Sequence, residues 1–323
     1  MPPQPPPPVP APSSVSSVPR PPPPPPASNR FRKDPRLAEL YEADVAPVWT
    51  QPFGRLLLAQ LQPAELGKAT VLDVMCHAGY PGLELLRRCP DARLIAIDPS
   101  AALIELARRK AGALVGRRVF FRTESAEPAL PFDEGVYDLV VSNLGLYDAA
   151  QPRRLLHEMA RVARPGAAVL ATLPLRGSFH EFHALMAGLV EERPREKARL
   201  EAHLTSWPDA AALYDWAADA GLEDITVVAQ PFSLLLAGAA DLFFAPVIEY
   251  GPLSQWKAIL GERGPDMQAA FNELREAIDL SCATGQPFVL TVRAACLRAR
   301  KPRPPALPTF EEDPDNAPTR PGH

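Results

Sequence analysis

Residues 71–82 read Val-Leu-Asp-Val-Met-Cys-His-Ala-Gly-Tyr-Pro-Gly, and this stretch decides the fold. Residues 71–74 are typical of the end of a buried strand, and a turn that contains Gly79 leads into a helical pattern carried by Leu83, Leu85 and Leu86. The stretch therefore predicts a strand, a tight turn and a helix. In an open α/β sheet, such a turn presents backbone N–H groups at the carboxyl end of a strand, where ligands bind.

Strand and helix patterns alternate through the following hundred residues. Ser100 is a suitable N-cap for the helix that follows the second predicted strand, and Pro152 suits the first turn of another helix. This alternation predicts a doubly wound parallel sheet with right-handed crossovers. The strands expected after the first one cover residues 93–98, 118–123, 137–143 and 167–173, with the helix between the last two ending at residues 164–166.

The last part of the chain predicts a different arrangement. Residues 224–229 and 287–295 have strand patterns, and a long helical stretch, residues 239–280, lies between them. We therefore expect an α/β fold with a mostly parallel seven-stranded sheet and a helical insertion before the last strand. The apolar side chains of the insertion are expected to form either a substrate lid or ordinary core; they are Phe243, Phe244, Ile248 and Tyr250.

Proline content divides the chain into three parts. Residues 1–28 are almost entirely Pro, Ser, Val and Ala, and such a segment cannot bury enough apolar surface to offset its ordering entropy. We expect a disordered tail at 1–28, a folded domain at 29–300 and a second Pro-rich, acidic tail at 301–323. The first tail is either a ligand for a proline-reading module or a spacer.

Charge and cysteine content argue against several function classes. The formal net charge is −4, with both signs spread along the chain, so we expect neither nucleic-acid binding nor attachment to an anionic membrane. The four cysteines have neither metal-site spacing nor the density of a disulfide framework. His180 and His183 have no third ligand nearby, so no metal site is expected. The absence of a long apolar run or a signal-peptide pattern leads us to expect a cytoplasmic protein.

The order of these motifs resembles that of class I S-adenosylmethionine-dependent methyltransferases, in particular the small-molecule enzymes of the methyltransferase type 11 group. The family pattern Asp-x-Gly-x-Gly-x-Gly is represented here by Asp73, Met75, His77 and Gly79, so the first motif is degenerate at two glycines. Residues 158–166 match the family segment Glu-x-x-Arg-Val-x-x-Pro-Gly closely and are the most specific part of the resemblance.

The resemblance implies that S-adenosylmethionine binds at the carboxyl edge of the sheet. Asp98 follows Asp73 by 25 residues, close to the spacing of about 20 at which an acidic residue contacts the ribose hydroxyls. Alternatively, Asp98 is simply an acidic residue at the start of a helix. Glu124 or Ser125 would replace the family aspartate that contacts the adenine amine. The implied cofactor-binding residues are Asp73, Met75, Cys76, His77, Gly79, Asp98, Pro99, Glu124, Ser125, Asn143 and Leu144.

The acceptor side of the predicted site is less specific. Residues 142–145 read Ser-Asn-Leu-Gly, which differs from the Asn-Pro-Pro-Tyr type of N-methyltransferases and favours an oxygen or carbon of a small molecule as the acceptor. Tyr147 stands where relatives often carry a histidine that faces the acceptor. It is therefore a candidate general base or orienting group, or else a half-buried aromatic of the loop.

Met75 and His77 leave a second hypothesis open. A residue other than glycine in a left-handed conformation costs about 1–2 kcal/mol, although histidine enters this region more readily than most. Both side chains are also expected to project into space that the cofactor fills. The chain is thus either an active methyltransferase with a variant loop or an inactive relative that acts as a binding or scaffold protein. A nicotinamide-dependent oxidoreductase is disfavoured because the turn lacks the G-x-G-x-x-G glycines.

Overall fold

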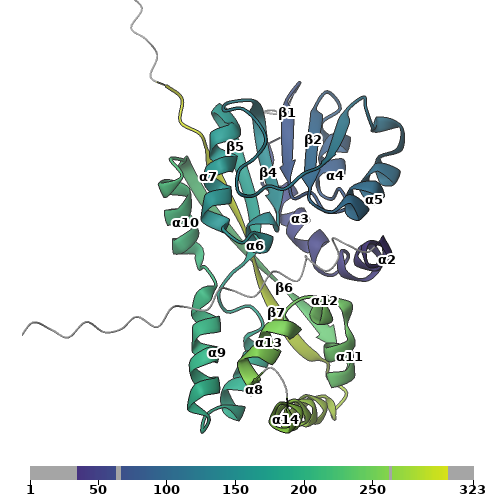
Figure 1. The fold of residues 1–323 in the computed structure, drawn as a ribbon, viewed down its shortest axis with the longest axis vertical. Helices are drawn as coiled ribbons and strands as arrows, with labels where there is room; N and C mark the ends of the chain where they lie inside the picture. Colours follow the sequence, from purple (N-terminus) through teal and green to yellow (C-terminus); the bar gives the residue numbers. More distant parts are fainter. Residues whose placement is uncertain (1–34, 63–66, 262–263, 305–323) are drawn as a thin grey trace, which may run out of the picture.

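Seven strands form one sheet in the order β3-β2-β1-β4-β5-β7-β6 (Figure 1). The computed structural model describes residues 35–62, 67–261 and 264–304, so the tail predicted at 1–28 and most of that predicted at 301–323 lie outside the described residues. The strands are β1 (Thr70–Val74), β2 (Arg93–Asp98), β3 (Val119–Thr123), β4 (Tyr137–Asn143), β5 (Ala163–Pro174), β6 (Glu223–Leu236) and β7 (Phe288–Arg300).

The strand directions confirm the expected mostly parallel α/β sheet. Strands β1 to β5 pair in parallel, and β7 runs antiparallel to both β5 and β6. Strands β6 and β7 are longer than predicted because they continue past the sheet as a two-stranded ribbon, in which Leu236 pairs with Phe288. Strand β5 begins earlier than expected, since the preceding helix ends at Val162. Pro165 disfavours helical geometry at the residue before it, which accounts for this early end.

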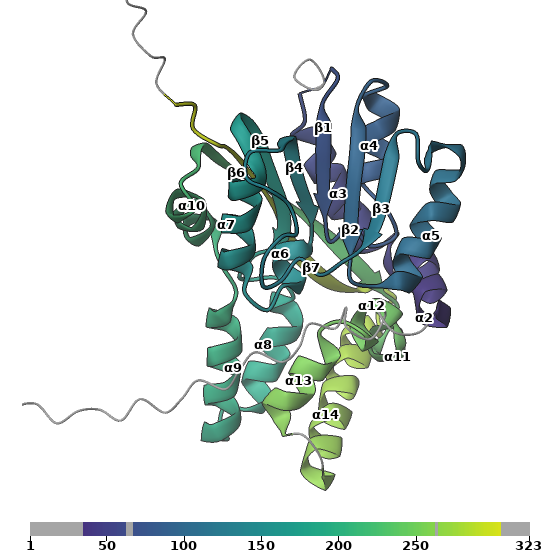
Figure 2. The same ribbon diagram turned by 45° about the horizontal axis from the view of Figure 1, so that its top comes forward.

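Helices cover both faces of the sheet, and alternate strand residues face each layer (Figure 2). Val71 of β1 belongs to one apolar cluster and its neighbour Leu72 to the other, and both are fully buried. This is the two-residue period of a strand covered on both faces. The first layer contains α3 (Thr50–Ala59), α4 (Gly82–Arg88) and α5 (Ala101–Ala111), followed by the short η3 (Gly112–Leu114); the second contains α6 (Gly145–Asp148), α7 (Pro152–Val162) and α10 (Ala210–Asp219).

A helical lobe extends beyond the carboxyl edge of the parallel strands (Figure 1). Its centre is fully buried Trp256, whose ring centroid lies 4.1 Å from that of Phe182. The predicted insertion is present as four helices, but Phe244 is 78% exposed, so its assignment to an apolar wall is wrong. The lobe contains α8 (His180–Leu189), α9 (Pro194–Ser206), α11 (Ala239–Phe244), α12 (Pro246–Glu249), α13 (Leu253–Leu260) and α14 (Pro265–Cys282). Two leading elements, α2 (Pro35–Leu40) and η1 (Tyr41–Val45), lie against α5 and α12.

His183 belongs to the core of this lobe. Its Nε2 accepts a hydrogen bond from Nε1–H of Trp256 at 3.2 Å, and burial lowers its pKa to about 3, so the ring is neutral. Among the described residues, no three His, Cys, Asp or Glu side chains come together in a way that would hold a metal ion. In the same part of the chain, none of the helices has the length and apolarity needed to cross a membrane.

The segment 158–166, which is the most specific sequence match, has a structural role. Arg161 pairs with Glu158 one turn earlier on α7 and donates hydrogen bonds to the carbonyl oxygens of Leu130 and Phe132. Glu158 also accepts the backbone N–H of Leu130 at 2.9 Å, and the hydrogen bonds from Arg161 lower its pKa. The pair therefore holds the connection between β3 and β4 against the sheet.

Arg161→Gln is expected to lower the free energy of unfolding by about 1.5–3 kcal/mol, because it removes charge-assisted hydrogen bonds to Glu158 and to a partly buried loop. Urea denaturation measures the change. Arg87→Gln is the matched control, since Arg87 also pairs with a glutamate three residues away but its side chain is 72% exposed. It is expected to change stability by less than about 0.5 kcal/mol. Equal losses in the two variants would contradict the role given to Arg161.

Candidate functional site

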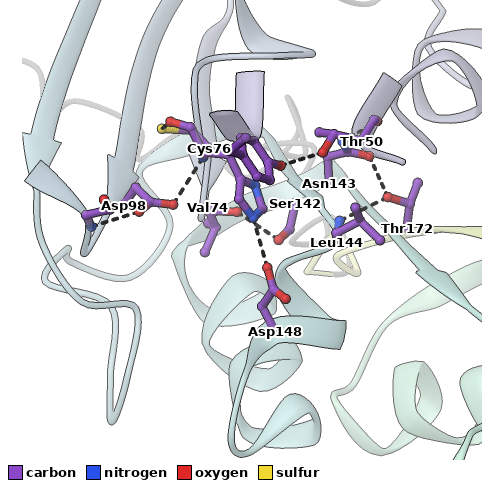
Figure 3. A network of polar contacts seen from close by, with 12 residues as sticks. Thr50, Val74, Cys76, Asp98, Ser142, Asn143, Leu144, Asp148 and Thr172 are labelled. Atoms are coloured by element: carbon purple, nitrogen blue, oxygen red, sulfur yellow. Dashed lines mark hydrogen bonds and ion pairs between the residues drawn. The ribbon is translucent and has the colours of Figure 1, made fainter. Parts of the chain in front are cut away.

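The candidate site lies where the carboxyl ends of β1, β2 and β4 meet η1 and α6 (Figure 3). After β1 the backbone enters the left-handed region at three alternate residues: Met75 (φ 58°), His77 (φ 49°) and Gly79 (φ 88°). The sequence thus keeps the turn of the glycine-rich motif with only one of its glycines. Because both other positions carry side chains, the turn fills space that glycines would leave open.

Asp98 holds this turn in place. Its Oδ2 accepts the backbone N–H of His77 at 3.1 Å, and its Oδ1 accepts that of Ser100 at 2.8 Å. The backbone N–H of Cys76 donates to the carbonyl oxygen of Ile97 at 2.9 Å. Asp98 is 1% exposed, so its carboxylate serves the backbone of the turn and of the helix start. Ser100 caps α5 as predicted, accepting the N–H of Leu103.

The imidazole of His77 forms a buried polar pair. Its Nε2 lies 2.8 Å from Oδ2 of Asp148, and both side chains are less than a tenth exposed. The ring stacks on Tyr41, with centroids 5.7 Å apart and planes 11° from parallel. The hydroxyl of Tyr41 is hydrogen-bonded to Oγ1 of Thr50, and burial raises the pKa of Tyr41 far above its ordinary value. His77 is therefore fixed in the site from two directions.

A second set of polar contacts joins three elements through Thr50, Asn143 and Thr172 (Figure 3). The Asn143 side chain donates to the Thr50 carbonyl oxygen at 3.0 Å and accepts the hydroxyl of Thr172 at 2.7 Å. Thr172 in turn accepts the backbone N–H of Leu144 at 3.1 Å. The predicted residues Asn143 and Leu144 therefore lie at the site, with their polar groups engaged in joining α3, β4 and β5.

Asp73 is fully buried and has no well-formed hydrogen bond to either carboxylate oxygen among the described residues. The backbone of Gly82 lies so close that a Cβ there would come within 2.5 Å of Oδ2. Burial raises the pKa of Asp73 to about 7, with the nearby His77 acting in the opposite direction and Asp98 adding to the increase. This carboxyl group therefore changes protonation near neutral pH.

The other predicted site residues lie further apart. Glu124 is paired with Arg122, and the hydroxyl of Ser125 donates to the carbonyl oxygen of Glu127, so both belong to the surface connection after β3. Tyr147 packs between the rings of Trp49 and Trp207, and burial raises its pKa far above 10. A tyrosine that holds its proton so firmly is a poor general base.

The structure adds residues that sequence reasoning did not assign to the site. Asp148 and Thr50 contact the site directly, and Thr172 supports it. Asp148 directly follows Tyr147, after the polar end of β4, and this was the one available signal. Thr50 and Thr172 come from elements distant in sequence, and single threonines in a helix and a strand carry no pattern that points to a site.

A cavity beside His77 at this edge of the sheet is small, about 50 Å³. Pockets that hold small molecules measure about 300–1,000 Å³. Asp73, Asp98 and Asn143 are each at most 1% exposed and do not line the cavity. In this conformation, the cavity beside His77 and Tyr41 is therefore too small for a ligand of the size of S-adenosylmethionine. The lining includes Tyr41, Trp49, His77, Leu144, Asp148 and Tyr250.

Comparisons with known proteins agree with the fold. The family described as "Methyltransferase domain" matches residues 71–166. A malonyl-[acyl-carrier protein] O-methyltransferase of Halorhodospira halophila is 30% identical over 201 residues, which cover 62% of this chain and 63% of that protein. A demethylmenaquinone methyltransferase of Mycolicibacterium gilvum is 30% identical over 177 residues, which cover 51% of this chain and 72% of that protein.

A solved structure has a similar fold at low sequence identity. It is a phosphoethanolamine N-methyltransferase of Haemonchus contortus in complex with phosphomonomethylethanolamine and S-adenosylhomocysteine. The TM-score is 0.50 and the identity 15%, over 86% of this chain and 59% of that one. This likeness concerns the fold alone.

The match to the Halorhodospira protein spans less than two thirds of that protein. The residues matched by the family, 71–166, include the variant turn, Asp98 and Arg161.

Asp73→Asn is expected to stabilise the protein more at pH 8 than at pH 5. The folded pKa of about 7 lies above the unfolded value of 3.8, so ionised Asp73 destabilises the fold progressively from about pH 4 and fully above pH 7. Asparagine carries no charge at either pH, so the variant does not lose stability by burying an ionised side chain. Relative to the original protein, its free energy of unfolding is expected to rise by about 2–3 kcal/mol between pH 5 and pH 8.

Urea denaturation at the two pH values measures this difference. The exposed Asp91 provides the control, and Asp91→Asn is expected to shift stability by the same small amount at both pH values. An Asp73→Asn effect that does not change with pH would show that Asp73 ionises as an ordinary carboxyl group.

Proposed function

Because this chain belongs to the class I S-adenosylmethionine-dependent methyltransferase family, we propose that it keeps the family's fold while its own side chains fill the cofactor site. In this proposal the protein is a catalytically inactive member that acts as a binding or scaffold protein. One observation carries the proposal: the imidazole of His77, at a position where the family has glycine, is buried between Asp148 and Tyr41.

The closed site supports this proposal in two ways. First, the two oxygens of Asp98 already bind backbone N–H groups, and the residue is sealed from solvent. Second, the His77–Asp148 contact is a hydrogen bond of normal length, 2.8 Å, between side chains that are less than a tenth exposed, and such buried bonds are strong. The proline-rich segment 1–28 is then proposed as the handle for a partner that contains a proline-reading module.

The second candidate function is S-adenosylmethionine-dependent methyl transfer to an oxygen or carbon of a small molecule. The retention of Asp98 and Asn143 at the ends of β2 and β4 favours it. The Halorhodospira relative, by its name, acts on oxygen. His77 is held by a hydrogen bond and a ring stack, interactions worth about 1–3 kcal/mol in total, which a micromolar ligand can displace. In that case His77 and Tyr41 move aside when the cofactor enters.

Calorimetry and thermal denaturation of the full chain with S-adenosylmethionine separate the two candidates. The proposed inactive protein is expected to give no saturable heat and no change in melting temperature at about 1 mM ligand. A dissociation constant of about 10 μM would instead stabilise the fold by about 2.7 kcal/mol at that concentration, a readily measured shift. Such a shift would overturn the inactive assignment.

Removal of the blocking side chains tests the cause. The double variant Met75→Gly/His77→Gly restores glycine at both left-handed positions and removes the imidazole, so it is expected to gain binding of S-adenosylmethionine. Cys76→Gly is the matched control, because it loosens the same turn and leaves the imidazole in place. If the double variant remains folded but gains no binding, His77 is not what closes the site.

A further inference from the structure

Strand β6 forms an outer edge of the sheet without the charges that usually protect such an edge. It is the last strand in the strand order and pairs with β7 alone. Residues 225–236 contain no charged side chain, although charged residues make up 22% of the chain. Exposed edge strands commonly carry charges that keep another chain from pairing with them. An uncharged strand rich in β-branched and aromatic residues is prone to such pairing.

The hydrogen bonds of β7 show which of its backbone groups face β6. The N–H of Thr291 donates to the Glu181 carboxylate at 2.9 Å, and its carbonyl oxygen accepts the N–H of Phe179 at 2.6 Å, both on the side away from β6. Arg293 uses both of its backbone groups in the same direction. Because this direction alternates along a strand, the backbone groups of Val292, between them, face β6.

The pairing register carries this alternation over to β6. Phe232 pairs with Val292, so the backbone groups of Phe232 face β7, and those of its neighbours Pro231 and Ser233 face the open edge. The outward-facing residues of the regular part of the strand are Val227, Ala229, Pro231, Ser233 and Leu235. No element in the described ranges forms a hydrogen bond with their outward backbone groups. Leu235 is also 66% exposed, so the edge is open.

Pro231 stands at the middle of this outward row. Its nitrogen points to the open edge, so the missing N–H costs β6 no hydrogen bond to β7. Its ring occupies the place from which an N–H would donate to an added strand. Both flanking outward residues, Ala229 and Ser233, are exposed. A strand laid along this edge would therefore meet the ring at the centre of the paired segment, where a donor is needed.

We infer that Pro231 keeps β6 from pairing with β6 of a second copy of this chain. Two identical edges can pair antiparallel about a two-fold axis, which makes a second copy the partner that this edge fits. Centred on Pro231, the pairing would set Val227 of one copy opposite Leu235 of the other and would bury no charge. The two proline rings would meet at the axis and block it. This inference does not depend on whether the candidate site binds a cofactor.

Pro231→Val in the full chain tests the inference. Valine supplies the missing N–H at the centre of the edge and favours strand geometry. The variant is expected to double its mass in sedimentation experiments between about 1 and 100 μM, whereas the original chain keeps the same mass over this range. Pro231 is exposed, so an unchanged melting temperature at low concentration is expected and verifies the fold. A folded variant that does not double its mass would overturn the inference.

Hydrogen exchange locates the contact. Pairing through the edge is expected to slow exchange of the outward N–H groups of Ala229, Ser233 and Leu235 as the concentration of Pro231→Val rises. The N–H of Phe232, which faces β7 in the monomer, serves as the internal reference. A dimer that leaves exchange of the outward groups unchanged would contradict the inference, and so would concentration-dependent protection of these groups in the original chain.

Two further variants separate the proline from the apolar surface of the strand. Ser233→Val adds a valine at an outward position and keeps Pro231, so it is expected to behave as the original chain. Ala229→Pro combined with Pro231→Val moves the proline to another outward position and is expected to abolish the dimer. Dimerisation of Ser233→Val as strong as that of Pro231→Val would overturn the inference, as would a folded double variant that still forms the dimer.

Discussion

The turn after β1 must cross the carboxyl edge of the sheet with a left-handed backbone at residues 75, 77 and 79, and the rest of the site depends on this constraint. Asp98 satisfies it by accepting the N–H of His77 and anchoring the turn to the end of β2. Because only Gly79 lacks a side chain, the same geometry that elsewhere leaves room for a ligand here directs an imidazole into the site.

That imidazole converts the edge of the sheet into a closed polar unit. His77 contacts Asp148 on α6 and Tyr41 on η1, while Asn143 joins Thr50 and Thr172. Six chain segments, the turn, α6, η1, α3, β4 and β5, thus meet through buried hydrogen bonds and one ring stack, and each hydrogen bond is costly to break without a replacement.

Local sequence patterns predicted much of the fold because they report burial directly. The alternation of apolar strands and amphipathic helices predicted the parallel sheet, and Ser100 was correctly expected to cap α5. Errors had two causes. Longer-range packing extends β6 and β7 past the sheet into the lobe, whereas α7 ends early because Pro165 disfavours helical geometry at the residue before it. Phe244 has an apolar side chain but is exposed, since its helix presents other residues to the core.

The sequence by itself determined the fold class, the place of the turn and the two missing glycines, since these depend on periodicity and residue identity along short segments. Only the tertiary structure decided what fills the site. The partners of His77 lie 36 and 71 residues away, at Tyr41 and Asp148, and come together because the strands place their carboxyl ends at one edge.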